Sequence, residues 1–208
     1  MNKQEIAEIL LDIGAVKLQP NEPFTFASGI KSPIYCDNRL LMGHVEERRT
    51  IIDAFEKMLK ENGVAFDVIA GTASAGIPHA AWLAEKENAP MIYVRSSTKE
   101  HGMQNKIEGP LKEGQKVLVI EDLISTGGSS AAAVEAVRSA GGVVDYCAAI
   151  FTYDFRKAEN RFRGINCNLI ALTDFETLVK VAEQRGDITA EQKEIILKWN
   201  KDPENWGK

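Results

Sequence analysis

The chain reads VLVIEDLISTGGSS from Val117 to Ser130. Four apolar residues of strand type lead into two adjacent carboxylates, and a turn rich in hydroxyl groups and glycine follows. The Ala-rich residues 131–134 then open a helix. The turn and the helix N-terminus offer amide N–H groups to a phosphate, and the carboxylates sit where sugar hydroxyls or a metal can meet them. This order of elements predicts a site for a phosphorylated ribose.

The segments on either side of this motif alternate between strand and helix patterns. Strands are predicted at residues 67–70, 90–94, 117–120, 143–152 and 169–172, and helices at residues 43–62, 77–87, 129–140, 175–185 and 189–201. Such alternation is typical of an α/β fold, in which helices flank a mainly parallel central sheet. A length of 208 residues fits a single domain.

The N-terminal part of the chain lacks the alternation of strands and helices seen in the rest. A capping box formed by Asn2 and Glu5 starts a helix that ends at Gly14, and prolines and glycines interrupt the next twenty residues. We therefore expect residues 1–42 to form a small subdomain packed over the sheet, which we call the hood. Residues 43–208 form the core of the same domain in this prediction.

Composition excludes several classes of function. The net charge of -5 argues against general nucleic-acid binding, and the apolar runs are too short to span a membrane. The N-terminus lacks the apolar segment of a secretory signal, so a cytoplasmic location is expected. Three cysteines without a CxxC motif and three scattered histidines make a structural zinc site an unfavoured hypothesis.

Each part of the motif also has a purely structural explanation that involves no ligand. The turn at residues 125–129 can be an ordinary strand-to-helix connection, and the acidic pair a solvated strand end. In the functional interpretation, Glu121 and Asp122 accept hydrogen bonds from ribose hydroxyls, bind Mg²⁺ through water, or stabilise positive charge on the anomeric carbon. A second small-residue turn at residues 71–78 either holds another phosphate or lets a helix pack closely on a strand.

A polar segment at residues 95–114 interrupts the alternating pattern. Loops of about twenty residues are uncommon in compact domains and are usually functional or disordered. Arg95, Lys99 and His101 place three potential cations within this loop. They can close over a pyrophosphate and neutralise it as it leaves, whereas an isolated run of this kind is more often a solvated surface loop.

These motifs together resemble those of a known family. Residues 117–130 are similar to the phosphoribosyl-diphosphate-binding motif of the type I phosphoribosyltransferases. Within that family, residues 24–37 (FTFASGIKSPIYCD) resemble the N-terminal segment of the orotate phosphoribosyltransferases, and residues 95–102 (RSSTKEHG) resemble their catalytic loop. The resemblance covers nearly the whole chain and implies the type I phosphoribosyltransferase fold.

The resemblance implies a glycosyltransferase (pentosyltransferase) of pyrimidine biosynthesis. It would use Mg²⁺ to transfer the phosphoribosyl group to orotate, giving orotidine 5-monophosphate and pyrophosphate. It would work as a homodimer that shares the loop at residues 95–114 across subunits, with small-molecule substrates and neither nucleic acid nor membrane as partners. Two alternatives stay open: a purine or other nucleobase phosphoribosyltransferase, and a non-catalytic regulator that senses the sugar diphosphate.

The resemblance also implies roles for particular residues. Lys99, His101 and Asp122 are the expected catalytic residues, and Ser125 is expected to approach orotate. No residue is assigned as a direct metal ligand, because Mg²⁺ would be held through the substrate and water. Tyr153 and Arg156 fall near a position from which some members contact orotate, and neither is assigned. The residues expected to bind the sugar diphosphate are Arg95, Lys99, His101, Glu121, Asp122, Leu123, Ile124, Ser125, Thr126, Gly127, Gly128 and Ser129.

Overall fold

The structure is a computed structural model of the 208-residue chain, and it describes residues 1–25, 31–96 and 106–206. At its centre lies a six-stranded sheet with the strand order β10-β9-β8-β5-β6-β7. Its strands are β5 (Val68–Thr72), β6 (Met91–Val94), β7 (Ile107–Glu108), β8 (Lys116–Ile124), β9 (Val143–Thr152) and β10 (Asn168–Asp174). All neighbouring pairs are parallel except β6 with β7. The predicted α/β class with a mainly parallel sheet is confirmed.

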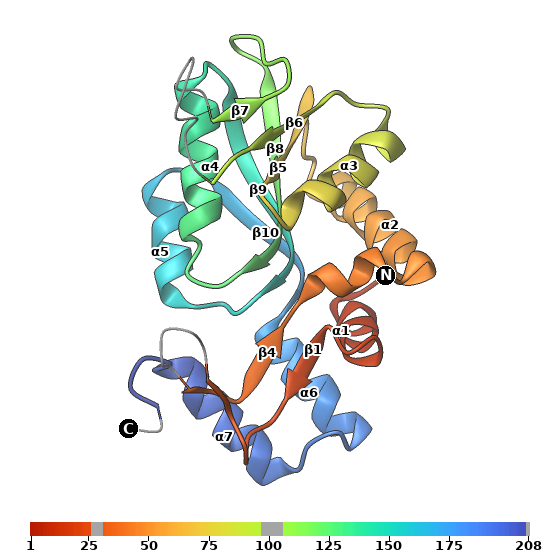
Figure 1. The fold of residues 1–208 in the computed structure, drawn as a ribbon, viewed down its shortest axis with the longest axis vertical. Coiled ribbons are helices and arrows are strands. Elements are labelled where there is room, and N and C mark those ends of the chain that lie inside the picture. Colours follow the sequence, from red (N-terminus) through yellow and green to blue (C-terminus); the bar gives the residue numbers. More distant parts are fainter. Residues whose placement is uncertain (26–30, 97–105, 207–208) are drawn as a thin grey trace.

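Helices cover both faces of this sheet (Figure 1). On one face lie α2 (Val45–Glu61) and α3 (Gly76–Glu87), and on the other lie α4 (Gly128–Ser139) and α5 (Arg156–Gly164). The buried residues divide in the same way. Leu118 and Ile120 of β8 belong to the α2–α3 side of the core, whereas Val117 and Val119 belong to the α4–α5 side. Consecutive β8 residues therefore point to opposite faces of the sheet.

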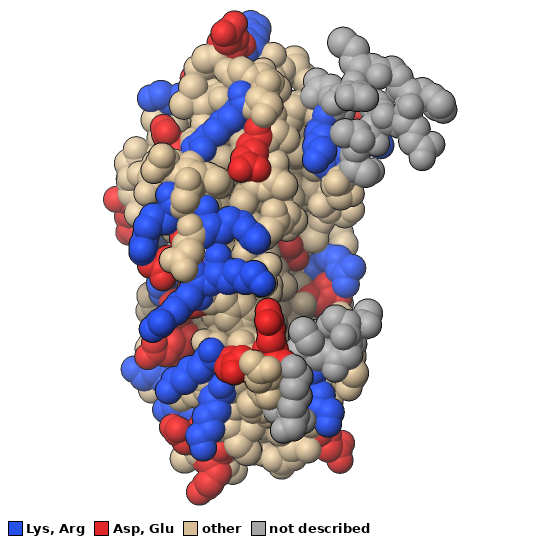
Figure 2. Space-filling model, turned by 90° about the vertical axis from the view of Figure 1, so that its left-hand side faces the viewer, with Lys and Arg blue, Asp and Glu red and all other residues tan. Residues whose placement is uncertain are grey.

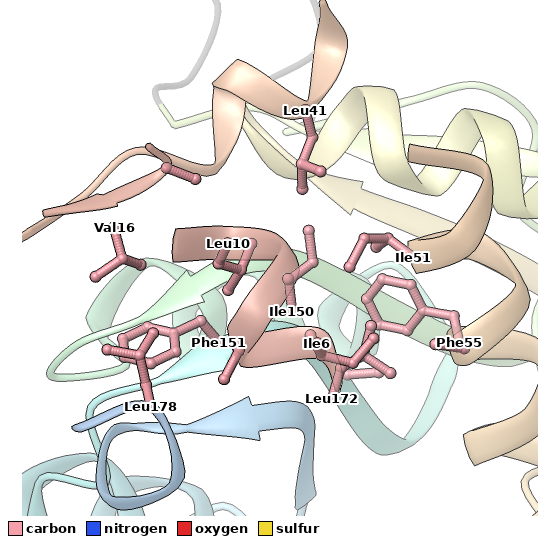
Figure 3. Close-up of a cluster of buried hydrophobic side chains, with 14 of the residues drawn as sticks. Ile6, Leu10, Val16, Leu41, Ile51, Phe55, Ile150, Phe151, Leu172 and Leu178 are labelled. Carbon is pink, nitrogen blue, oxygen red and sulfur yellow. The ribbon is translucent and has the colours of Figure 1, made fainter. Parts of the chain in front are cut away.

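The remaining elements gather beyond the carboxyl ends of the parallel strands, in the lower part of Figure 1. They are α1 (Lys3–Asp12), β1 (Val16–Leu18), β2 (Phe24–Thr25), β3 (Lys31–Ser32), β4 (Ile34–Cys36), the 3₁₀ helix η1 (Asn38–Met42), α6 (Phe175–Arg185) and α7 (Ala190–Lys201). Figure 3 shows Ile6 and Leu10 of α1 among buried side chains of α2, β9, β10 and α6. The N-terminal elements thus share a core with the rest, and the boundary at residue 42 stays a prediction.

Local sequence signals explain several of the element boundaries. The capping box at Asn2 is present, with the Asn2 side chain accepting from the Glu5 amide and the Glu5 carboxylate accepting from the Asn2 amide. Helix α6 begins after Asp174, whose carboxylate accepts from the Thr177 amide, and it ends at Gly186 with φ 80°. Capping groups of this kind satisfy the free amides and carbonyls at helix ends.

Three features differ from the sequence-based predictions. Strand β8 continues through the acidic pair to Ile124 instead of ending at residue 120, because Leu123 and Ile124 keep pairing with β9. Helix α5 was not predicted, and neither was β7 within the polar segment at residues 95–114. In the described ranges, no helix has both the length and the apolar character needed to cross a membrane.

Candidate active site

The motif at residues 117–130 lies at the point where the strand order of the sheet reverses. The chain passes from β5 to β6 on one side, and then returns to β8 on the other side of β5. In open α/β sheets, ligands bind outside the carboxyl ends of the strands at such a point. Two small-residue turns meet there: residues 73–75 after β5, and residues 125–127 after β8.

Residues 125–129, which we call the phosphate loop, connect β8 to α4. Gly127 caps α4 with φ 69°, a left-handed conformation that favours glycine, and its carbonyl accepts from the Ala131 amide. Helix α4 therefore starts with amides that have no partner inside the helix, beside the exposed residues Ser125, Thr126 and Ser129. This arrangement can hold a phosphate group at the positive end of the helix dipole.

Glu121 turns from β8 toward the first turn of α4. Its side chain is 5% exposed, and Oε2 accepts a 2.8 Å hydrogen bond from the Ser130 hydroxyl and a 3.5 Å one from Ser129. Burial, and then the neighbouring Asp122 carboxylate, raise the pKa of Glu121 to about 8. Glu121 thereby couples the end of β8 to the start of the helix that follows the phosphate loop.

Asp122 follows Glu121 in β8, and the two carboxyl groups lie close enough for a side-chain hydrogen bond between them. Its carbonyl accepts a 2.7 Å hydrogen bond from Asn38 Nδ2, and Asn38, in η1, is fully buried. Burial raises the pKa of Asp122, and hydrogen bonds to the Glu121 carboxyl group and to backbone amides oppose this shift. The two carboxyl groups thus interact directly with each other, and Asp122 is the less buried of the two.

The turn after β5 shows close backbone packing. A Cβ atom on Gly76 would lie 2.5 Å from the Ile120 carbonyl oxygen and 3.4 Å from Glu121 Oε1. A Cβ atom on Gly71 would lie 2.8 Å from the Ile77 Cα. The glycines therefore let α3 pack against β5 and β8, as one of the two predictions for this turn requires. The same packing brings residues 73–75 beside the acidic pair.

The predicted cationic loop is described only in part. Arg95 follows β6, and its guanidinium lies 3.6 Å from the Glu108 carboxylate of β7. Its amide donates to the Lys106 carbonyl, so both ends of the segment are joined at this point. Lys99 and His101 lie outside the described residues, and their roles stay predictions.

A pocket of about 730 Å³ opens beside the phosphate loop. Ser125 and Thr126 form one wall, residues 153–157 after β9 form a second, and residues 199–204 at the end of α7 form a third. The aromatic rings of Tyr153 and Phe155 are stacked at 5.3 Å, and Trp199 meets both rings edge-on. The pocket is therefore lined by aromatic rings on one side and by hydroxyl groups on the other.

Two contacts of α7 hold this pocket together. Asn200 Nδ2 donates a 2.8 Å hydrogen bond to the Tyr153 carbonyl, and Trp199 Nε1 donates a 3.2 Å one to the Lys31 carbonyl of β3. The sequence analysis did not include Trp199 or Asn200 in the site. In the sequence, only the aromatic character of residues 153, 155 and 199 could have indicated that these residues line a pocket together.

The described residues do not form a metal cage of their own. Within them, no group of three or more His, Cys, Asp or Glu side chains can hold a metal ion. Glu121 and Asp122 supply hard oxygen atoms of the kind that Mg²⁺ prefers. This donor set fits an ion that arrives with a phosphorylated ligand and keeps water in its shell.

Comparison with known proteins gives a consistent result. Residues 44–169 match the family model described as phosphoribosyl transferase domain. The chain is 53% identical to the orotate phosphoribosyltransferase of Listeria innocua over 99% of both chains, and 50% identical to that of Coxiella burnetii over 97% of both. A crystal structure of orotate phosphoribosyltransferase from Aeropyrum pernix is similar with a TM-score of 0.76 and 27% identity, covering 88% of this chain and 99% of that one.

Proposed function

The chain belongs to the orotate phosphoribosyltransferase family, and from this premise we propose that it catalyses that family's reaction at the carboxyl ends of β5 and β8. The reaction transfers the 5-phosphoribosyl group from phosphoribosyl diphosphate to orotate. It yields orotidine 5-monophosphate and pyrophosphate, a step of pyrimidine biosynthesis. One observation carries the assignment of the site: at the switch point of the sheet, the phosphate loop closely follows the acidic pair in the chain and also lines the pocket of about 730 Å³.

The 5-phosphate is assigned to the phosphate loop. The first amides of α4 and the Thr126 hydroxyl group provide donors for its oxygens, and the helix dipole favours its negative charge. Leu123 and Ile124 contribute backbone only, because Ile124 is fully buried and Leu123 packs on the core. Because they pair with β9 at the end of β8, they fix where the strand ends and the phosphate loop begins.

The ribose is assigned to the acidic pair. The Asp122 carboxylate is the better placed of the two to accept from ribose hydroxyls, because Glu121 is already bonded to Ser130 and Ser129. In the transition state the anomeric carbon carries positive charge as the bond to pyrophosphate breaks ahead of attack. A preorganised carboxylate nearby stabilises that charge more than it stabilises the ground state.

The base is assigned to the pocket bounded by the phosphate loop, residues 153–157 and α7. Its aromatic wall suits a planar ring, and Ser125 lies on the opposite wall. Arg156 also lines the pocket and can pair with the carboxylate of orotate, whereas Lys157 already pairs with Glu204. Bound as an anion, orotate has a ring nitrogen that is readily deprotonated, so the site does not require a strong general base.

The pyrophosphate is assigned to the loop that begins at Arg95. Arg95, Lys99 and His101 supply cationic or proton-donating groups for the developing charge of the leaving group. Mg²⁺, when bound through the diphosphate and water, would neutralise further charge on the leaving group. Residues 74 and 75, in the turn after β5, offer backbone amides to the same diphosphate, whereas the Ala73 amide already donates to the Val94 carbonyl.

We also propose that the protein forms a homodimer. In the part of the chain that the structure describes, seven large apolar side chains are exposed, and four of them fall between β4 and the start of α2: Tyr35, Leu40, Met42 and Val45. A concentration of exposed apolar side chains is typical of a protein interface. A dimer formed there would bring a second subunit next to the hood and the site.

Consumption of orotate tests the proposed function. With phosphoribosyl diphosphate and Mg²⁺ present, we expect orotate absorbance to fall and pyrophosphate to appear in equal amount. A purine phosphoribosyltransferase would instead release pyrophosphate with adenine, guanine or hypoxanthine and leave orotate unchanged. A regulator would bind the sugar diphosphate tightly and release no pyrophosphate with any base.

A further inference from the structure

Helix α5 packs directly beneath the phosphate loop. Phe162 is 2% exposed, and a Cβ atom on Gly127 would lie 2.9 Å from its Cε2 atom. The same hypothetical Cβ atom would lie 3.5 Å from the Ala158 side chain. Two residues one turn apart on α5 thus press against the glycine that caps α4, so α5 sets the position of the loop.

Arg161, the residue before Phe162, reaches the loop itself. Its Nη1 donates a 2.7 Å hydrogen bond to the Thr126 carbonyl oxygen. A Cβ atom on Gly128 would lie 3.0 Å from the same nitrogen, so the guanidinium lies against the backbone of the first residue of α4. A planar trans peptide points its C=O and N–H in opposite directions. By holding the Thr126 carbonyl toward α5, Arg161 therefore directs the Gly127 N–H away from α5.

The charge of Arg161 is unusual for this location. The N-terminus of a helix carries a partial positive charge, so a cation beside it is unfavourable unless an anion is also present. Among the described residues, no carboxylate lies within ion-pair distance of Arg161, whereas Arg163, two positions on, pairs with Glu159. Figure 2 shows Lys and Arg side chains gathered across the middle of the face on which α4 and α5 lie, and α5 alone contains four: Arg156, Lys157, Arg161 and Arg163. A phosphate dianion on the loop would make the charge of Arg161 favourable.

We propose that Arg161 is a positioning residue of the 5-phosphate site. It orients the peptide between Thr126 and Gly127 and adds a positive charge beside the first turn of α4. The enzyme then selects ligands that carry a 5-phosphate partly through α5, an element outside the motif at residues 117–130. The proposal rests on the proposed function, because it assigns the 5-phosphate to this loop.

The proposal is tested by measuring separately the affinities for ribose 5-phosphate and for pyrophosphate, which are the two phosphate-bearing halves of phosphoribosyl diphosphate. Ribose 5-phosphate carries only the 5-phosphate, and pyrophosphate occupies only the leaving-group side. We expect Arg161→Gln to weaken binding of ribose 5-phosphate by about tenfold and to raise the KM for phosphoribosyl diphosphate by a similar factor, as for loss of one charge-assisted hydrogen bond. Its affinity for pyrophosphate and the KM for orotate should stay within about twofold of native.

Two further variants separate positioning from simple folding effects. Arg161→Lys keeps the charge and one donor, so it should recover part of the ribose 5-phosphate affinity. Arg163→Gln removes an exposed cation from the same helix and should bind both ligands as the native chain does. The proposal is overturned if Arg161→Gln binds ribose 5-phosphate like the native chain, if both ligands weaken equally, or if Arg163→Gln shows the same loss. If the native protein binds no ribose 5-phosphate and consumes no orotate, it is the proposed function that fails.

Discussion

The Ser130 hydroxyl, in the first turn of α4, donates a 2.8 Å hydrogen bond to the Glu121 carboxylate near the end of β8. The two residues bracket the phosphate loop, and both are buried. Because this bond closes the loop from strand to helix, it limits how far the amides of α4 can move. The same burial raises the pKa of Glu121 to about 8, so the site contains a carboxyl group that titrates near neutral pH.

The first prediction concerns the effect of pH on stability through Glu121. The pKa of this carboxyl in the folded chain lies above its value of 4.5 in the unfolded chain. Its stabilising contribution is therefore fully present below about pH 4.5 and is lost as the pH rises through about 8. We expect Glu121→Gln, which mimics the protonated form, to gain about 2 kcal/mol of unfolding free energy relative to the native chain between about pH 5 and pH 9.

Urea unfolding of the ligand-free protein at several pH values measures this gain. Glu135→Gln, at an exposed carboxylate of α4, is the control. A difference between Glu121→Gln and the native chain that does not change with pH would contradict the prediction.

The second prediction concerns the effect of pH on stability through His79 of α3. Its pKa is shifted downward, in contrast to that of Glu121. It is 1% exposed, and neither ring nitrogen has a hydrogen-bond partner among the described residues. Burial lowers its pKa from 6.5 to about 4, so the unfolded chain binds more protons between these values, and stability falls as the pH drops through this window. We expect His79→Leu to remove about 2 kcal/mol of this acid-induced loss, measured by urea unfolding at about pH 4.5 and pH 7. His44→Gln, at a histidine whose side chain is half-exposed, serves as the control.

Much of the fold could be predicted because its elements are long and periodic. Helix α6 was predicted with its observed bounds, 175–185, and in the structure Asp174 and Gly186 cap its ends. The end of β8 was missed because Glu121 and Asp122 interrupt its apolar pattern, although pairing with β9 continues to Ile124. Tertiary hydrogen bonding outweighed the local pattern at this point.

The candidate site was predictable only where its residues lie close together in the sequence. The phosphate loop and the acidic pair form one continuous motif. Helix α5 was missed because its nine residues contain mostly charged side chains, and only Ala158 and Phe162 are buried. The contacts of Arg161 with the loop span 35 positions in the sequence, and no local pattern indicates them.

The third prediction concerns Gly127. Its φ of 69° and the Phe162 ring 2.9 Å from a hypothetical Cβ atom both oppose any side chain at this position. We expect Gly127→Ala to cost about 1–2 kcal/mol of stability from backbone conformation alone, and to raise the KM for phosphoribosyl diphosphate by about tenfold. Thermal unfolding and initial-rate kinetics measure the two effects. Gly164→Ala, at a helical glycine of α5 with no atom within 4 Å of its hypothetical Cβ, is the control; it should leave the KM unchanged and cost no stability. A native KM in Gly127→Ala would show that the loop tolerates displacement.

The fourth prediction concerns Trp199. Its Nε1 bonds the Lys31 carbonyl, and its ring packs against Tyr153 and Phe155, so it joins β3 to the wall of the pocket. We expect Trp199→Phe to raise the KM for orotate by about fivefold, the effect of losing one hydrogen bond, with the KM for phosphoribosyl diphosphate unchanged. Trp82→Phe, on α3, serves as the control and should leave both KM values at their native levels. An equal rise of both KM values in Trp199→Phe would indicate general loss of structure instead of a role in the base pocket.

The fifth prediction concerns sharing of the site between subunits. Lys99→Ala should reduce turnover far more than it weakens orotate binding, because the lysine is assigned to the leaving group. Asp122→Ala should also be nearly inactive, because it removes the carboxylate assigned to the ribose. If the loop of one subunit completes the site of the other, a heterodimer of the two variants contains one site with both defects and one intact site.

Mixing the two variants after unfolding and refolding them together measures this sharing. Random assortment makes half of the dimers heterodimers, so activity should recover to about a quarter of the native value. Refolding either variant by itself is the control and should recover nothing. Inactive mixtures in which heterodimers are verified by differently tagged chains would place each loop in its own subunit. A monomeric molecular mass for the active native protein would contradict the homodimer itself, since a site that needs two chains cannot work in one.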